Sequence, residues 1–498
     1  MSSTKYVLAI DQGTTGSTAA LINARDFSFV DDVGQDYPQI YPSPGLVEHN
    51  LNQIWDTVRY TVTELLKRNN LTGKDIASIG ITNQRETTCA FDNNGNPLAN
   101  AIVWQDRRTH EYCKSLQEKH AASIKTKTGL PIDPYFSASK MNWLLKNNEK
   151  VQNAAKNKNL KFGTIDTFLL YKLTDKVSYA TEPSNASRTL LFNLKETDWD
   201  KDLLNLFEVK REFLPNVQES FSLFGKTKNC DFLPDDIPIT GILGDQQSAL
   251  FGQACLNKGD MKCTYGTGAF LLLNTGSEIK YSNSGLVTTI AYKYQGKTFY
   301  ALEGSCYIAG AAIQWLRDNL KIIAQSHESE ALARKVKSLT EMENILLLPF
   351  FTGIGSPYWI SQAKAAIVGI TRDTENSHLA RAALDGISFS VNDIVVAMGK
   401  DLGEPIKALK VDGGAVQNNL LMEIQSTISQ LDIIRPANVE TTSYGAALAS
   451  LVGNKQLSIE EINKFWKIDK KFSPNTNESA FYAKKFVQWK DTIKRLYF

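Results

Sequence analysis

The 498-residue sequence is poor in the residues that build metal sites and disulfide frameworks, with only six cysteines and five histidines. No Cys-x-x-Cys pair is present, and His110 with Cys113 has no second pair to complete a zinc site. The histidines are isolated from one another in sequence, and no Gly-x-Ser-x-Gly elbow is present. A zinc site, a disulfide framework and hydrolysis by a Ser-His-Asp triad therefore lack support, and we expect reduced cysteines.

Charge of one sign and long apolar runs are also lacking. The formal net charge of +2 gives no reason to expect a nucleic acid or a membrane surface as partner. The apolar run at residues 345–351 is far shorter than the ~18 residues that a membrane span needs. Residues 1–10 lead into a short apolar strand without the basic region and apolar core of a signal peptide. We therefore expect a cytoplasmic protein without membrane insertion.

The common nucleotide-binding fingerprints are missing as well. Residues 296–298 (Gly-Lys-Thr) end like a P-loop, but that motif requires a glycine where this chain has Ala291. Residues 266–268 (Gly-Thr-Gly) begin like a dinucleotide fingerprint, but Leu271 occupies the position of its third glycine. Neither motif therefore explains a nucleotide site in this chain.

The chain does contain strands that alternate with helical stretches in both halves, as is typical of α/β domains. Apolar runs at residues 6–10 and 18–22 surround a polar Gly/Thr turn, which predicts a hairpin. Residues 261–265 and 269–273 repeat this design around a Gly-Thr-Gly turn. The length and the repeat predict two similar domains, residues 1–254 and 255–498, with the break at a turn within residues 253–260.

Further elements are predicted from local pattern. Strands are expected at residues 76–82, 101–104 and 406–411, and a helix at residues 418–430. Near the C-terminus, an apolar stripe at helical spacing predicts packing against the second domain; it consists of Phe486, Trp489, Ile493 and Leu496.

Three aspartates lie at predicted strand ends beside short turns: Asp11, Asp245 and Asp412. Glycines let backbone N–H groups approach phosphate oxygens closely, and threonine hydroxyls add donors. A carboxylate at a strand end can hold a hydrated Mg²⁺, which takes only one or two carboxylates. One such turn is an ordinary loop feature. Three in this order favour a site for phosphate and Mg²⁺.

With these features the sequence resembles the FGGY carbohydrate kinases over residues 6–452. The markers are Asp11-Gln12-Gly13-Thr14-Thr15, Trp104-x-Asp106-x-Arg108, residues 135–147 with Lys140 and Trp143, Gly266-Thr267-Gly268 and Asp412-Gly413-Gly414. The resemblance implies an α/β fold of two facing ribonuclease H-like domains, of the actin, hexokinase and Hsp70 ATPase type, with a cleft between them. The first domain would hold the substrate site and one phosphate loop, and the second would hold another phosphate loop and the adenosine pocket.

Within the family, four stretches resemble the members that phosphorylate glycerol: residues 80–88, 133–137, 185–189 and 244–247. The resemblance implies ATP-dependent conversion of glycerol to sn-glycerol 3-phosphate and ADP in glycerol uptake and catabolism. It further implies Mg²⁺ as cofactor and a homo-oligomer, either a dimer or a tetramer. Two alternatives stay open. One is a kinase of this family for xylulose or gluconate, and the other is a non-enzymatic actin-like ATP switch, which needs phosphate loops but no polyol site.

The resemblance also implies residue roles. The glycerol site is expected at Arg85, Glu86, Trp104, Tyr135, Asp245, Gln246 and Phe270, with Asp245 as the catalytic base. The nucleotide site is expected at Thr14, Thr15, Gly16, Thr18, Thr267, Gly310, Gln314, Gly414 and Asn418. The expected metal ligands are Asp11, through a metal-bound water, and Asp245. A triol this small has to be recognised by several hydrogen bonds, and those to charged groups contribute about 1.5–3 kcal/mol each.

Two departures from the family pattern affect these expectations. Many of the members that phosphorylate glycerol have arginine where this chain has Thr18, so the charge balance at the phosphates differs. Members inhibited by fructose bisphosphate have a glycine-rich, arginine-containing loop before the strand that leads to the catalytic aspartate. Residues 226–236 of this chain contain three aspartates and no glycine, so we expect no inhibition by that compound.

Overall fold

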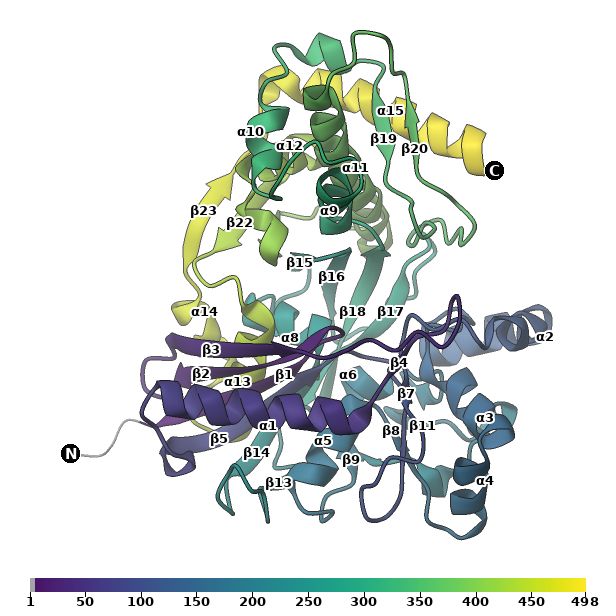
Figure 1. The fold of residues 1–498 in the computed structure, drawn as a ribbon, viewed down its shortest axis with the longest axis vertical. Helices are drawn as coiled ribbons and strands as arrows, with labels where there is room; N and C mark the ends of the chain where they lie inside the picture. The colour runs from purple at the N-terminus through teal and green to yellow at the C-terminus, as the bar shows by residue number, and fades with distance from the viewer. Residues whose placement is uncertain (1–4) are drawn as a thin grey trace.

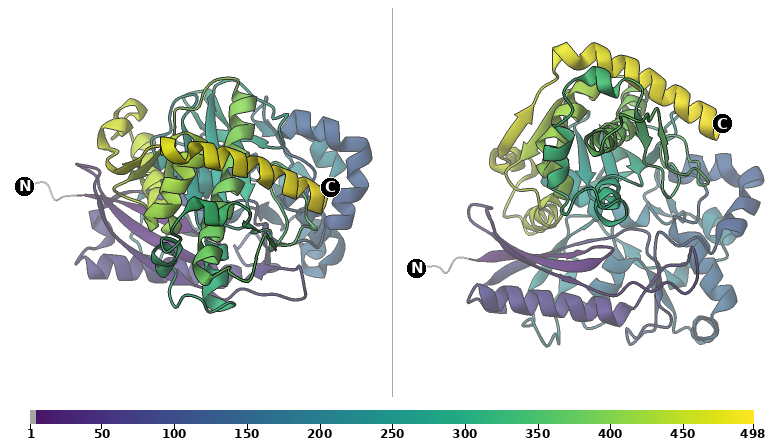
Figure 2. Two further views of the ribbon diagram at one scale, coloured as in Figure 1. Left: turned by 90° about the horizontal axis from the view of Figure 1, so that it is seen from above. Right: turned by 45° about the horizontal axis from the view of Figure 1, so that its top comes forward.

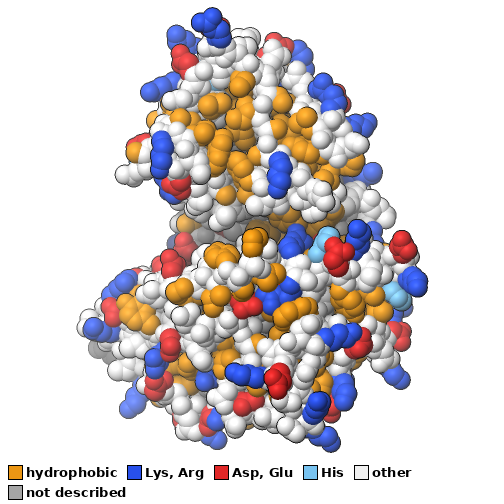
Figure 3. Space-filling model, turned by 45° about the vertical axis from the view of Figure 1, so that its right-hand side comes forward, with side chains coloured by type: hydrophobic (Ala, Val, Ile, Leu, Met, Phe, Trp, Pro, Cys, Tyr) orange, Lys and Arg blue, Asp and Glu red, His pale blue; other side chains and the backbone are white. Residues whose placement is uncertain are grey.

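Figure 1 shows a computed structural model of the protein, which describes residues 5–498. The chain forms two lobes, each built around one large sheet, and a notch separates the lobes in the space-filling view (Figure 3). The lower sheet has six strands in the order β13-β14-β5-β1-β2-β3. Their bounds are β13 (Gly225–Lys226), β14 (Pro238–Gly244), β5 (Ile76–Asn83), β1 (Tyr6–Gln12), β2 (Gly16–Asn23) and β3 (Phe29–Asp36).

The upper sheet has seven strands in the order β17-β18-β16-β15-β21-β22-β23. Their bounds are β17 (Val287–Tyr294), β18 (Lys297–Cys306), β16 (Ala269–Gly276), β15 (Met261–Tyr265), β21 (Ala408–Asp412), β22 (Asp432–Pro436) and β23 (Ile468–Phe472). Short two-stranded ladders pair β4 (Glu48–His49) with β7 (Ala101–Ile102), β6 (Cys89–Phe91) with β8 (Lys161–Gly163), β9 (Ala180–Thr181) with β12 (Asn216–Val217), β10 (Phe192–Asn193) with β11 (Asp198–Trp199), and β19 (Leu346–Leu348) with β20 (Ala366–Val368).

The two sheets repeat one topology, and both predicted hairpins are confirmed. Strand β1 is antiparallel to β2, with Asp11 opposite Thr18, and β15 is antiparallel to β16, with Thr264 opposite Phe270. On its other edge each first strand begins a parallel series, β1-β5-β14 in the lower sheet and β15-β21-β22 in the upper sheet. A repeat of about a dozen residues therefore predicted a duplicated α/β architecture correctly.

The other predicted elements are mostly confirmed. The strands at 76–82 and 406–411 correspond to β5 and β21, and the helix at 418–430 corresponds to α12 (Asn419–Ser429). The strand expected at 101–104 is shorter, because the chain turns after β7, where the Asp106 N–H donates to the Val103 carbonyl at 3.0 Å.

Helices cover both faces of the lower sheet. Helix α1 (Leu51–Arg68) packs on β2 and β3 (Figure 1). The opposite face is covered by α13 (Thr441–Gly453), which comes from late in the sequence. A Cβ at Gly80 would lie 2.0 Å from the Ala446 carbonyl oxygen, so only glycine permits this contact. The remaining helices of the lower lobe are α2 (His110–Thr128), α3 (Ser137–Asn147), α4 (Glu149–Lys156), α5 (Ile165–Leu173), α6 (Pro183–Ala186) and α7 (Lys201–Leu206).

A short helix, α8 (Asp245–Gly252), contacts strands of both sheets and also α13. One hydrophobic cluster joins residues from early and late in the chain at this position, among them Val7, Leu250, Leu272 and Leu448. The two lobes therefore share a buried core beside α8, where the first residue of that helix is Asp245.

The upper lobe contains α9 (Gly310–Asp318), α10 (Glu328–Ala333), α11 (Asn376–Leu402), α12, α14 (Ile462–Phe465) and α15 (Thr476–Tyr497). Among the described residues, α11 alone is long and apolar enough to cross a membrane by length and composition. In its most apolar window, 89% of the residues are buried inside the protein. This helix therefore serves as the central core helix of the upper lobe.

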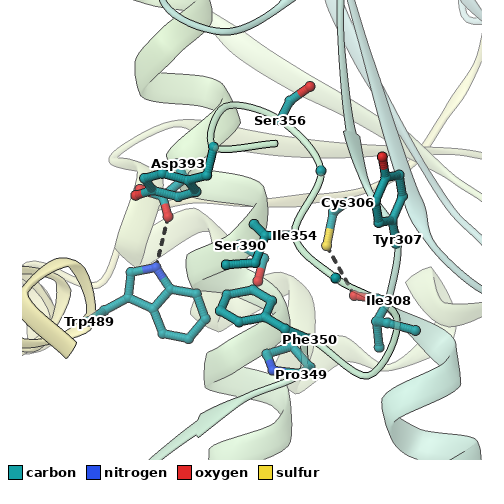
Figure 4. A pocket seen from close by; sticks show the side chains of 13 residues that line it. Cys306, Tyr307, Ile308, Pro349, Phe350, Ile354, Ser356, Ser390, Asp393 and Trp489 are labelled. Carbon is teal, nitrogen blue, oxygen red and sulfur yellow. Dashed lines mark hydrogen bonds between the residues drawn. The ribbon is translucent and has the colours of Figure 1, made fainter. Parts of the chain in front are cut away.

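Helix α15 runs across the outer end of the upper lobe (Figure 2) and packs on α11. The Trp489 indole N–H donates to Asp393 of α11 at 2.8 Å, beside a hollow of only about 10 Å³ (Figure 4). Trp489 and Ile493 are buried, as the predicted stripe requires, but Leu496 is 48% exposed. The prediction for Leu496 was wrong because the last turn instead directs Tyr497 toward Phe350 of the lobe.

Candidate active site

The lower sheet brings two of the predicted aspartates to one edge. Strands β1 and β14 lie on either side of β5 and run parallel to it, so their carboxyl ends meet at the same edge. Asp11 lies near the end of β1, and Asp245 follows β14 directly. The third, Asp412, is buried and accepts hydrogen bonds from Gln253 at 2.8 Å and Thr441 at 2.7 Å. Asp412 therefore has a structural role, whereas Asp11 and Asp245 lie close enough for their charges to interact.

Asp11 and Asp245 fit a divalent cation. Burial, and then the negative charges of Asp245 and Glu440, raises the pKa of Asp11 to about 8. A cation held between these carboxylates would relieve their repulsion, and Mg²⁺ needs only one or two carboxylates when phosphates and waters supply the rest. Within residues 5–498 no group of three or more His, Cys, Asp or Glu side chains forms a metal cage, so a protein-only site is not present there.

Arg85 is the centre of the charged part of the site. It follows β5, and its Nε lies 3.0 Å from Asp245 Oδ1. Its two terminal nitrogens both contact the carboxylate of Glu303, which lies on β18 of the upper sheet. A Cβ at Gly244 would lie 2.7 Å from the Arg85 side chain, so the glycine before Asp245 makes room for this arginine.

Glu86 and Arg188 extend the same network. Arg188 Nε lies 2.5 Å from Glu86 Oε1, and its Nη2 lies 2.9 Å from Glu303. All of these side chains are at least 97% buried. Burial opposes ionisation of Glu303, but Arg188 and Arg85 hold its pKa below the ordinary value. Glu86 has a φ of +61°, a rare backbone conformation that accompanies constrained functional sites.

Neither Glu303 nor Arg188 was predicted as a site residue. Arg188 lies in the stretch 185–189 that supported the resemblance, so that stretch already contained the signal. Glu303 lies within a strand and belongs to no recognised motif. Its charge directly after the apolar run at residues 299–302 of β18 was the only available hint.

Three aromatic side chains form one wall beside these charges. The ring of Trp104 lies 5.4 Å from that of Tyr135 and 6.4 Å from that of Phe270. The Trp104 indole N–H donates to Thr14 Oγ1 at 3.0 Å. The aromatic residues of the predicted glycerol site therefore contact the first predicted phosphate loop through Trp104. Gln246 follows Asp245 on α8, and its backbone N–H donates to Asp245 Oδ1 at 2.7 Å.

The first predicted phosphate loop is the turn between β1 and β2. The Gly13 N–H donates to the Gly16 carbonyl at 2.9 Å, and the Tyr37 hydroxyl lies 2.8 Å from the Gly13 and Thr14 carbonyl oxygens. A Cβ at Gly16 would lie 2.7 Å from the Gln35 carbonyl oxygen. Contacts with Tyr37 and Gln35 thus hold one side of the loop, while the side chain of Thr15 is exposed.

The predicted nucleotide residues of the upper lobe line one cavity of about 440 Å³: Thr267, Gly310, Gln314, Gly414 and Asn418. A Cβ at Gly310 would lie 2.6 Å from the Gly266 carbonyl oxygen, so the second loop packs directly on the start of α9. Nothing lies near the position of a Cβ at Gly414, which leaves the backbone there open to a ligand. Thr14, Thr15, Gly16 and Thr18 do not line this cavity and lie on the lower lobe.

The same cavity has further polar residues that were not predicted. Ser326, His327, Ser329 and Glu330 come from the segment around α10. Asn418 caps α12 by accepting the Leu421 N–H at 2.9 Å, and its amide nitrogen lies 3.3 Å from Ser329 Oγ. The segment around α10 contains no glycine and belongs to no recognised motif, which explains why the sequence did not reveal these residues.

Comparison with known proteins agrees with this arrangement. The model of the N-terminal domain of the FGGY family of carbohydrate kinases matches residues 6–252, and the C-terminal domain model matches residues 261–453. A glycerol kinase of Staphylococcus epidermidis is 45% identical over 494 residues, covering 98% of each chain. The crystal structure of Plasmodium falciparum glycerol kinase with ADP is 35% identical, with a TM-score of 0.90 over 99% of each chain.

More distant structures share the fold. The gluconate kinase of Lactobacillus acidophilus is 23% identical to the chain, with a TM-score of 0.88 over 99% of this chain and 98% of that one. This likeness concerns the architecture alone. Two family models that together match most of the sequence, and relatives that align over nearly its whole length, lead to one conclusion. The chain belongs to the FGGY family of carbohydrate kinases.

Proposed function

We propose that the chain is a glycerol kinase, which transfers the γ-phosphoryl group of ATP to a terminal hydroxyl of glycerol and releases sn-glycerol 3-phosphate and ADP. The observation that carries this proposal is Asp245 beside Arg85 at the edge of the lower sheet, next to a small aromatic wall. The names of the two relatives that align over nearly the whole chain support the same substrate. A role in glycerol uptake and catabolism follows.

The protein residues position glycerol and accept one proton. Asp245 Oδ1 is engaged by Arg85 and by the Gln246 N–H, so Oδ2 is the oxygen that accepts the hydroxyl proton. The glycerol oxygen forms a bond to the γ-phosphorus while the bond between that phosphorus and the β–γ bridging oxygen breaks. Glycerol binds through Arg85, Glu86 and Gln246 against the wall of Trp104, Tyr135 and Phe270.

ATP lies across the notch. Thr14, Thr15, Gly16 and Thr18 contact the phosphates from the lower lobe, and Thr267 contacts them from the upper lobe. Gly310, Gln314, Gly414 and Asn418 hold the adenosine part in the cavity of about 440 Å³. Asp11, through a metal-bound water, and Asp245 would hold Mg²⁺, which would neutralise charge on the phosphates. Thr18, which stands where many relatives have arginine, leaves more of that neutralisation to the cation.

The wider context of the enzyme is proposed on general grounds. We propose a cytoplasmic enzyme that works as a homo-oligomer, either a dimer or a tetramer, and that has no nucleic-acid or membrane partner. The net charge of +2 and the buried position of α11 support the absence of a nucleic-acid or membrane partner. We also propose residues 1–254 and 255–498 as the two domains, which is supported by the separate sheets on either side of this point.

Product identity tests the proposal directly. The purified chain is incubated with glycerol, ATP and Mg²⁺, and the product is analysed by ³¹P NMR and by a dehydrogenase specific for sn-glycerol 3-phosphate. We expect one phosphomonoester that the dehydrogenase oxidises completely. A product that the dehydrogenase rejects, or the absence of any phosphomonoester, would overturn the proposal.

A further inference from the structure

Lys262, on strand β15, is a buried lysine at the rear of the active site. Its side chain has no exposed surface, and its Nζ lies 2.5 Å from Gln246 Oε1 and 2.8 Å from Thr264 Oγ1. It also lies 3.4 Å from the Phe270 carbonyl oxygen. Lys262 therefore contacts two of the residues assigned to the glycerol site, Gln246 and Phe270.

No carboxylate contacts this lysine directly to offset the free-energy cost of burying its charge. Within residues 5–498 Lys262 takes part in no ion pair, and burial lowers its pKa, although the negative charges of Asp412 and Asp245 oppose that shift. Burying an ammonium group with only neutral oxygen partners is unfavourable. A neutral side chain of similar length would fill the same space at lower cost, so simple packing does not explain a lysine at this position.

The contact determines which way the amide of Gln246 points. Because an ammonium group can only donate, the amide oxygen has to face Lys262 and the amide nitrogen has to face away from it. In the described part of the chain, Gln246 Nε2 donates to no protein acceptor. Both of its hydrogens are therefore available to a ligand, and Gln246 directly follows Asp245 on α8.

We propose that Lys262 is a positioning residue that holds the Gln246 amide in the orientation that donates to a polyol hydroxyl beside Asp245. A hydroxyl that accepts from Gln246 directs its own proton toward the Asp245 carboxylate, which is the geometry required for proton transfer. Lys262 lies on the upper sheet and Gln246 on α8, so the contact also couples this orientation to the upper lobe. This inference rests on the proposed glycerol kinase activity.

Two neutral substitutions of similar length test the proposal. Lys262→Gln keeps a donor that can reach the Gln246 oxygen, whereas Lys262→Met has none. We expect Lys262→Met to raise KM for glycerol about tenfold, and Lys262→Gln to recover most of that loss, with KM for ATP within about twofold of wild type in both. Equal loss in both variants, which would indicate that only the charge matters, or no loss in either, would overturn the proposal. Lys297→Met, at an exposed end of β18, is the matched control and should leave the kinetics unchanged.

A second variant leaves Lys262 in place. Gln246→Glu keeps an oxygen for Lys262, and adds an ion pair, but has no amide donor. We expect this variant to fold with a Tm no lower than that of wild type and to raise KM for glycerol about as much as Gln246→Ala does. Wild-type glycerol binding in Gln246→Glu would overturn the proposal.

Combining Lys262→Met with Gln246→Ala completes the experiment. The double variant should be no worse than Gln246→Ala alone, because Lys262 acts through that amide. Additive losses would contradict this route of action. A wild-type protein that does not phosphorylate glycerol would instead refute the proposed function, so the two failures can be told apart.

Discussion

Glu303 of the upper sheet and Arg85, which follows β5 of the lower sheet, form a buried ion pair between the lobes. The same carboxylate also contacts Arg188 at 2.9 Å. Arg85 in turn contacts Asp245, so the position of the carboxylate that we propose as the base depends on a residue from the other lobe. This chain of contacts makes substrate binding sensitive to how the lobes are placed.

Glu303→Gln should therefore impair both stability and glycerol binding. The substitution removes the negative charge that neutralises two buried arginines, and breaking such a buried pair costs about 3–5 kcal/mol. We expect a loss of that size in the free energy of unfolding, measured with urea, and a rise of at least about tenfold in KM for glycerol. Glu404→Gln, which breaks an exposed pair with Lys258, should cost less than about 1 kcal/mol and leave KM unchanged. Equal effects of the two substitutions would contradict this account.

Asp245→Asn should abolish most of the catalysis while preserving the nucleotide site. The amide cannot accept the hydroxyl proton, so kcat should fall by about 10²–10⁴. The adenosine cavity lies on the other lobe, so ATP binding measured by calorimetry should stay close to that of wild type. A variant that retains more than about a tenth of the wild-type kcat would show that Asp245 is not the base.

His49 links stability to pH beside the first phosphate loop. Its Nε2 lies 2.6 Å from Gln39 Oε1, and burial lowers its pKa from 6.5 to about 4. Since the folded pKa lies below the unfolded value, its contribution is fully present above pH 6.5 and is lost as the pH falls toward about 4. The shift corresponds to about 3 kcal/mol.

We expect His49→Gln, which is not ionisable, to lose this part of the acid sensitivity. The free energy of unfolding should be measured for both proteins at about pH 7 and about pH 4.5. The variant should be less stable than wild type at the higher pH. At the lower pH, the difference in free energy of unfolding between the two proteins should be smaller by about 2 kcal/mol or more. If the difference in free energy of unfolding between the two proteins is the same at both pH values, His49 is not a buried neutral histidine.

The segment at residues 226–236 leads us to expect no response to fructose bisphosphate. Binding two phosphates needs arginines or backbone N–H nests. Here Lys226 Nζ lies 3.6 Å from Asp236 Oδ1, which neutralises one of the two lysines in the segment, and Asp231 and Asp235 add negative charge. A rate titration with millimolar fructose bisphosphate at low salt should leave activity unchanged. Saturable inhibition that disappears in a Lys226→Ala, Lys228→Ala variant would contradict this expectation.

Much of the fold could be predicted because local patterns agree with it. The hairpins around residues 13–16 and 266–268 carry both the strand alternation and the turn glycines, and the structure confirms them. The return of α13 to the lower sheet could not be predicted, because it depends on contacts such as that between Gly80 and Ala446, which are distant in sequence. The division at residue 254 stays a prediction, and a cut there would separate α13 from the strands it covers.

In the site, too, residues marked by their sequence neighbours could be predicted, whereas residues whose partners are distant in sequence could not. Asp11, Asp245 and the two loops were found because glycines and hydroxyl residues surround them in sequence. Glu303 and Lys262 are charged residues within largely buried strands, and the site residues that they contact lie in other elements. Only the fold brings Glu303 to Arg85 and Lys262 to Gln246, so no sequence pattern indicates that these two residues belong to the site.

The rate of ADP release with and without glycerol tests the central claim most directly. We expect the facing lobes to close on glycerol and to keep water from the γ-phosphate, so hydrolysis without an acceptor should be a small fraction of the kinase rate. A coupled assay should compare no acceptor, glycerol, xylulose and gluconate, with Asp245→Asn as the negative control. We predict rapid ADP release with glycerol alone. Rapid release without any acceptor, or a higher kcat/KM for xylulose or gluconate than for glycerol, would contradict the account.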